Sequence, residues 1–148
     1  METFEITSKS STMLKVSGYW LITTTIIHVL VGFLVFRKPL AEIAFNGWFN
    51  TVAPDPFNPY FDREDAFWFM MVAPFIFIIG QLCFWAKSRQ ITLPAFLGWT
   101  ILATATVGCF LEPISAFWLL IPPSLLILAA SRQARIQSAK STQPSEVL

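Results

Sequence analysis

The stretch from Val16 to Phe36 constrains the fold more than any other part of the chain. It reads VSGYWLITTTIIHVLVGFLVF, a nearly continuous apolar run that also carries the only histidine, His28. A helix rises about 1.5 Å per residue and the hydrocarbon core of a bilayer is about 30 Å thick, so about 20 such residues cross it. The run is longer than a signal-peptide core, and no cleavage site of small residues follows it. It predicts a retained membrane-spanning helix.

The composition of the whole chain agrees with residence in a membrane. Hydrophobic residues make up 55% of the 148 residues and charged residues 13%, against roughly 25% charged residues in soluble domains. The formal net charge is +1, and the absence of a basic cluster argues against a nucleic-acid partner. The two cysteines, Cys83 and Cys109, lack the spacing of a zinc site. No metal and no other cofactor is expected.

The hydropathy pattern predicts an all-α fold, an integral membrane four-helix bundle of one domain. The four spans are expected at about residues 16–36, 66–86, 93–111 and 114–130. A polar N-terminal segment, residues 1–15, is expected to be flexible or to lie on the membrane surface, and residues 131–148 form a polar tail whose first part extends the last helix.

A faint internal repeat predicts that the four spans form two hairpins in the same orientation. Ala66-Phe67-Trp68 opens the second span and Ala116-Phe117-Trp118 opens the fourth, and prolines follow each motif within two helical turns. Repeats of this kind are related by an axis along the membrane normal. The alternative is that interfacial aromatic residues recur for physical reasons alone.

The connection between the first two spans is the only sizeable loop. Its first half, PLAEIAFNGWFN, starts with a proline suited to the first turn of a helix and places apolar and polar residues on opposite sides. It predicts a short amphipathic helix on the outer membrane surface. Three further prolines exclude a regular helix from the second half, which is expected to form a cap or lid.

The basic residues predict the orientation, because loops rich in lysine and arginine stay in the cytoplasm. With the N-terminus inside, only Arg37, Lys38 and Arg63 lie outside. The cytoplasmic side then holds Lys9, Lys15, Lys87, Arg89, Arg132, Arg135 and Lys140. A multi-pass protein with both termini in the cytoplasm follows.

His28 is expected about eight residues, or roughly 12 Å, from the outer end of its span, deep in the bilayer. An ionisable group there is a candidate functional residue. Three residues on the same helix face should also point inward, namely Trp20, Thr24 and Gly32. The alternative is structural: a neutral imidazole N–H could satisfy a backbone carbonyl freed by Pro74 or by Pro122-Pro123.

Glu112 is the only carboxylate between Leu93 and Ala130. The short fourth span suggests that the turn before it is sunk into the membrane, toward the depth of His28. The two side chains are the candidate catalytic acid and base, and the alternative for Glu112 is a solvated turn carboxylate. The other residues expected around an outer-half cavity are Asn46, Trp48, Asn50, Asp65, Trp68 and Trp118. Alternatively, Asp65 caps a helix and the tryptophans are interface anchors.

The order of several short motifs resembles a family of small four-span membrane proteins known only as a domain of unknown function. The motifs are Gly18-Tyr19-Trp20, His28, Gly47-Trp48-Phe49-Asn50, Ala66-Phe67-Trp68-Phe69, Leu93-Pro94, Gly98-Trp99 and Ser115-Ala116-Phe117-Trp118. The resemblance implies the architecture and supports His28 as a motif position, but it implies no activity. In size and span count the chain is also distantly similar to DoxX-like proteins.

Three functions follow as hypotheses. The first is a membrane-embedded enzyme in which His28 and Glu112 isomerise or cyclise a terpenoid- or polyketide-like substrate by acid–base chemistry. The second is a non-catalytic accessory or lipid-binding protein. The third is a transporter, which would require oligomers. The expected partners are the lipid bilayer, a lipophilic small molecule, and a second copy of the chain or another membrane protein.

Overall fold

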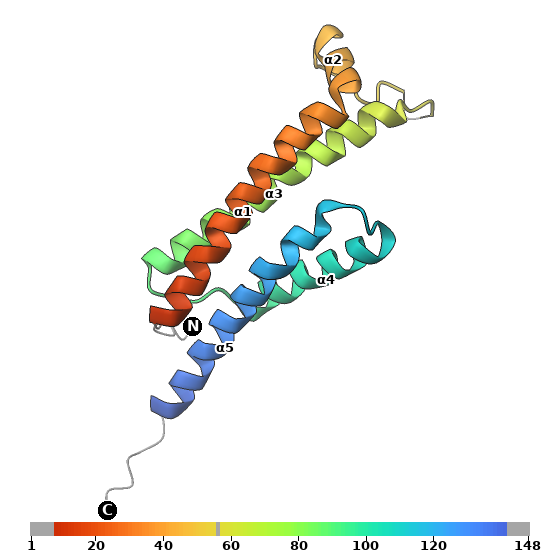
Figure 1. Ribbon diagram of the computed structural model, residues 1–148. Helices are drawn as coiled ribbons and strands as arrows, with labels where there is room; N and C mark the ends of the chain where they lie inside the picture. Colours follow the sequence, from red (N-terminus) through yellow and green to blue (C-terminus); the bar gives the residue numbers. More distant parts are fainter. Residues whose placement is uncertain (1–7, 56, 142–148) are drawn as a thin grey trace, which may run out of the picture. The chain divides into compact units, whose positions relative to one another are not determined.

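The computed structural model of the protein describes residues 8–55 and 57–141, and this part of the chain contains helices and no strand (Figure 1). The elements in chain order are α1 (Ser8–Val35), α2 (Arg37–Phe45), α3 (Phe61–Ser88), α4 (Ala95–Leu111), the short 3₁₀ helix η1 (Ala116–Leu120) and α5 (Ile121–Ser141). The prediction of an all-α protein is confirmed. A short helix lies in the first loop as predicted, but α2 ends at Phe45, and the last five residues of the predicted helix form turns instead.

Three helical segments are long and apolar enough to span a membrane: Ser8–Val35, Phe61–Ser88 and Ala116–Gln137. The remaining predicted span, the third at about residues 93–111, corresponds to α4, an apolar helix of 17 residues. A helix of that length lies at the lower limit of about 17 residues for a crossing. The described chain therefore offers three or four spans, as a membrane protein does.

The helix α1 begins at Ser8, earlier than the sequence predicts. Ser10 and Leu14 are fully buried, and the Ser10 hydroxyl lies 3.1 Å from the side-chain oxygen of Gln133 on α5. The lead-in is therefore helical and packed from Ser8 onward, while residues 1–7 are outside the described part. The hydropathy pattern did not predict these first helical residues, because serine and threonine lower the mean hydropathy. Small hydroxyl side chains nevertheless favour close helix packing.

The chain divides into two compact units, with boundaries at Ile22/Thr23 and at Ile78/Ile79. Unit 1 combines the N-terminal part of α1, the C-terminal part of α3, and α4, η1 and α5. Unit 2 contains the rest of α1, α2, the connection that follows it, and the first part of α3.

In unit 1, α4 and α5 form an antiparallel hairpin (Figure 1). Two glycines of α4 allow a close approach of the next elements: Gly98 faces Leu128 of α5, and Gly108 faces the ring of Phe117 in η1. The N-terminal part of α1 meets α3 in the same unit, where the rings of Tyr19 and Phe84 make an edge contact at 5.0 Å.

The two copies of the predicted repeat adopt different local structures. Ala66-Phe67-Trp68 lies within α3 with Pro74 inside the same helix, whereas Ala116-Phe117-Trp118 forms η1 and Pro122-Pro123 lies in the first turn of α5. Two adjacent prolines remove two backbone donors, so a regular helix starts there and does not continue through. Similar residues thus produce a long helix in one place and a helix start in the other.

Trp20 joins α1 to η1, just before the start of α5. Because Pro123 has no N–H, the carbonyl of Leu119 lacks its helical donor, and the indole Nε1 of Trp20 donates to it at 2.7 Å. One turn earlier on α1, the Ser17 hydroxyl donates to the carbonyl of Pro123 at 3.3 Å. Trp20 is thus a docking residue between helices of unit 1.

Trp20→Phe is expected to lower the free energy of unfolding by about 1 kcal/mol, because it leaves the Leu119 carbonyl without a donor. Thermal unfolding in detergent measures the change, with Trp99→Phe on exposed α4 surface as the control. Pro123→Ala restores a backbone N–H, so the effect of Trp20→Phe should shrink in that background. Equal effects in both backgrounds would contradict this assignment.

Candidate ligand site

Within unit 2, α1 and α3 are held together by close contacts around Gly32. A side chain at Gly32 would collide with Met70 and with the ring of Phe69, both on α3. The ring of Phe36, at the end of α1, lies 5.2 Å from that of Phe69. The short helix α2 and the connection after it link the ends of these two packed helices.

His28 belongs to this helix contact. Its ring stacks on that of Phe69, with centroids 4.0 Å apart and planes 9° from parallel, and its Nε2 lies 2.8 Å from the Phe69 carbonyl oxygen. A carbonyl only accepts, so Nε2 carries the hydrogen in this contact. Phe69 directly precedes Met70, whose carbonyl loses its helical donor at Pro74. His28 thus contacts a backbone carbonyl, as in the structural alternative, but it is the carbonyl one residue before the one that Pro74 frees.

Arg63 at the start of α3 ties three segments of unit 2 together. Its Nε and Nη2 both lie 3.3 Å from the same carboxylate oxygen of Glu42 on α2, and its Nη1 donates to the Thr51 carbonyl at 3.0 Å. The guanidinium also lies 4.5 Å from the centre of the Tyr60 ring. Since the Arg63 side chain is only 15% exposed, this cluster fixes the connection more firmly than a surface ion pair would.

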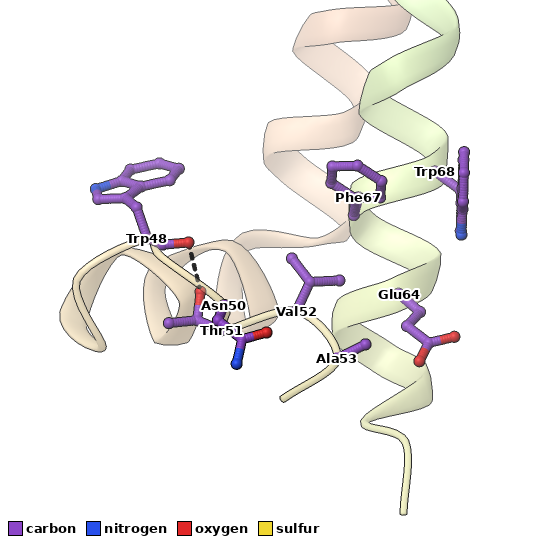
Figure 2. Close-up of a pocket in the computed structure, with 8 residues that line it drawn as sticks. All are labelled: Trp48, Asn50, Thr51, Val52, Ala53, Glu64, Phe67 and Trp68. Carbon is purple, nitrogen blue, oxygen red and sulfur yellow. Dashed lines mark hydrogen bonds between the residues drawn. The ribbon is translucent and has the colours of Figure 1, made fainter. Parts of the chain in front are cut away.

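The connection turns sharply after α2. Gly47, Trp48 and Asn50 all have left-handed backbones, with φ of 85°, 68° and 52°. Such a backbone is easy for glycine but costs energy for tryptophan, and it persists only where neighbouring groups hold it. The hydroxyl of buried Thr51 donates to the Trp48 carbonyl at 3.1 Å and closes the turn (Figure 2).

The connection after α2 and the start of α3 line an open hollow of about 440 Å³ (Figure 2). Its lining is mostly apolar and consists of Trp48, Asn50, Thr51, Val52, Ala53, Glu64, Phe67 and Trp68. Val52 and Phe67 lie between the two tryptophans, and the Glu64 carboxylate lies on the same side of α3 as Trp68 (Figure 2). Glu64 is the only ionisable side chain in the lining.

Three of the predicted pocket residues line this hollow, namely Trp48, Asn50 and Trp68. Asn46 does not: it is exposed, and its side-chain amide donates to the Glu42 carbonyl at 2.7 Å. Asp65 is exposed as well and is not part of the lining. The acidic residue in the lining is its neighbour Glu64, which the sequence pattern did not single out. Spacing could have found it, since positions 64, 67 and 68 share one face of a helix.

The inward stripe predicted on α1 is buried at Thr24 and Gly32 but exposed at Trp20, and it does not line the hollow. Thr24 is 6% exposed and Gly32 is buried, while His28 is half-buried. Trp118 lies in unit 1, where its indole donates to the Pro113 carbonyl at 2.9 Å and braces the turn before η1.

Glu112 follows the last residue of α4 and is exposed. Its backbone carbonyl accepts from the Ser115 hydroxyl at 2.6 Å. The residue also lines a second open hollow, of about 550 Å³, formed mainly by apolar side chains of α4 and by Phe117. Glu112 belongs to unit 1 and His28 to unit 2, so their pairing stays a prediction.

One family model matches residues 12–134 of the chain, and its description is "Family of unknown function (DUF6463)". The match runs from the first turns of α1 to the middle of α5 and takes in both hollows. No curated protein and no solved structure matches the chain.

Proposed function

Since the chain belongs to DUF6463, a family of unknown function, we propose a function from its own residues: it binds a lipophilic molecule in the hollow between the connection after α2 and the start of α3. The function is binding without a chemical step. It corresponds to the non-catalytic hypothesis drawn from the sequence.

The observation that carries the proposal is the hollow itself. Its volume of about 440 Å³ falls within the range of roughly 300–1,000 Å³ typical of small-molecule sites. Val52, Phe67 and Trp68 supply apolar surface, and Asn50 and Glu64 supply a few polar groups. Ligand sites combine these two kinds of surface so that the apolar part gives affinity and the polar groups fix orientation.

The scaffold around the hollow supports the same conclusion. The turn contains Trp48 in a strained left-handed conformation. It is held by the bond from the Thr51 hydroxyl to the Trp48 carbonyl and by the bond from Arg63 to the Thr51 carbonyl. Backbone strain of this kind concentrates at ligand sites, where it presets the geometry that a ligand needs. The connection is thus preorganised around the lining.

The proposed setting is the outer surface of the membrane, with both termini in the cytoplasm. Aromatic side chains at the end of α2 and in the connection after it are strongly exposed: Phe45 is 90%, Phe49 92% and Trp48 68% accessible. Exposed aromatic residues next to a spanning helix are typical of the membrane–water interface. A ligand there enters from the bilayer, with its chain among the lipids and its polar end at the hollow.

Acid–base isomerisation remains the second hypothesis, and one observation favours it: the Glu112 side chain lines an apolar hollow. It requires His28 to exchange a proton through Nδ1, because Nε2 is engaged with the Phe69 carbonyl. The binding function is the better supported of the two, because it requires no proton exchange at His28.

Val52→Trp is expected to fill the hollow and to weaken ligand binding about tenfold. The new indole ring takes the ligand's place and removes apolar contact worth roughly 1.4 kcal/mol of binding free energy. The probe is a long-chain fatty alcohol with a diazirine in its chain, photolysed with the protein in lipid nanodiscs. Peptide mass spectrometry should find the label concentrated in residues 48–53 and 64–68 and reduced in the variant.

The matched control is Ala103→Trp, which places the same side chain in the second hollow. Labelling of residues 48–53 and 64–68 should be unchanged in this control. Label spread over all exposed helix surfaces, without an effect of Val52→Trp, would overturn the proposed function.

A further inference from the structure

We infer that the hollow selects a lipophilic molecule with a cationic head, an amine or a quaternary ammonium group, and that the Glu64 carboxylate holds this head. The inference rests on the proposed function and names the class of ligand that the same site would take.

The charge of the lining is the first argument. Glu64 is half-buried and is the only ionisable side chain among the eight residues that line the hollow. The adjacent arginine does not neutralise it, because the donors of Arg63 are directed to Glu42 and to the Thr51 carbonyl. Within the described residues Glu64 makes no ion pair. The hollow therefore presents one uncompensated negative charge.

The aromatic surface beside that charge is the second argument. Trp68 lies one helical turn after Glu64, on the same side of α3 and against the same hollow (Figure 2). The face of an indole ring attracts cations and accepts the methyl groups of a quaternary ammonium ion. A carboxylate one helical turn from an indole ring, against the same hollow, suits a cationic head and repels a sulfate or phosphate without a compensating cation.

The third argument is the order of the charged and aromatic side chains along α3, which matches a ligand with a charged head and an apolar chain. Glu64 lies in the first turn of α3, while Phe67 and Trp68 lie about one turn further into the helix. A molecule with its head at Glu64 can therefore lay its chain along Phe67 and Val52. Partial burial of the carboxylate lowers the local dielectric constant, so its attraction for a cation exceeds that of a fully exposed pair.

The test compares three amphiphiles with the same dodecyl chain and different heads: trimethylammonium, uncharged maltoside and sulfate. Each competes with the neutral diazirine alcohol for labelling of the hollow in nanodiscs made of uncharged and zwitterionic components. The trimethylammonium compound is expected to compete about tenfold better than the maltoside, and the sulfate should compete worst.

Glu64→Gln should abolish this preference, so that the trimethylammonium and maltoside compounds compete equally. Asp65→Asn removes the same charge from the exposed neighbouring position and should leave the preference intact. The pair of variants separates a specific contact from the general attraction of cations to an acidic surface.

Equal competition by the cationic and uncharged heads in the wild-type protein, or a preference that survives Glu64→Gln, would overturn the inference while the neutral probe still labels the hollow. Failure of the proposed function looks different, because the neutral probe itself would not concentrate there. Choline, which has the head without the chain, distinguishes the source of the ligand: competition at millimolar choline indicates a soluble cation, and its absence indicates a lipid-like one.

Discussion

Replacing Arg63 with alanine is expected to release the connection between α2 and α3. The change removes both contacts to Glu42, the hydrogen bond to the Thr51 carbonyl and the stacking on Tyr60, and it leaves a partly buried carboxylate unpaired. Losses of this kind cost about 3 kcal/mol. Hydrogen exchange of the backbone amides in residues 46–55 should then accelerate on the order of 100-fold.

Two further variants show which part of the cluster matters. Arg63→Lys keeps the charge but cannot reach Glu42 and Thr51 together, so it should give an intermediate acceleration. Arg89→Ala removes an exposed arginine just after α3 and should have no effect. Unchanged exchange in Arg63→Ala would mean that the turn is held by its own backbone and not by the cluster.

His28→Ala is expected to destabilise unit 2 by about 3 kcal/mol. The variant loses a hydrogen bond to the Phe69 carbonyl, the stacking on the Phe69 ring, and buried volume between α1 and α3, and each of these contributes about 1 kcal/mol. In thermal unfolding in detergent the midpoint should fall by roughly 6–12 °C.

Conservative variants of His28 separate packing from chemistry. His28→Phe keeps the stacking and loses the donor, while His28→Gln keeps a donor and loses the ring, so each should recover part of the lost stability. In the acid–base hypothesis, His28→Gln instead abolishes turnover of a lipophilic substrate although the protein stays folded. A stable His28→Ala variant would contradict the packing role.

The sequence predicted the class of fold because lipid imposes a simple rule. Every backbone polar group must be paired inside the membrane, so long apolar runs become helices. The ends of the helices were predicted less accurately. Ser8 to Lys15 is helical and partly buried although its hydropathy is low, because close contacts with α5 outweigh the polarity of its serines.

The candidate site was predicted in part. Trp48, Asn50 and Trp68 were found, because a loop rich in aromatic and polar residues next to a span is an unusual combination. Asp65, also predicted for the pocket, is exposed and outside the lining, whereas its neighbour Glu64 lines the hollow. Adjacent helix positions point about 100° apart, and only the packing of the connection decides which of them faces the hollow.

The apolar run from Val16 to Phe36 by itself determined that the chain is helical and suited to a membrane, since its length and composition permit little else. The partners of its polar residues were decided by the tertiary structure. Trp20 meets the Leu119 carbonyl and His28 meets that of Phe69. Helical periodicity places such side chains on one face, but tertiary packing decides which carbonyl each one meets. The Leu119 carbonyl lost its helical donor at Pro123, whereas Phe69 lies one residue before the carbonyl that Pro74 frees.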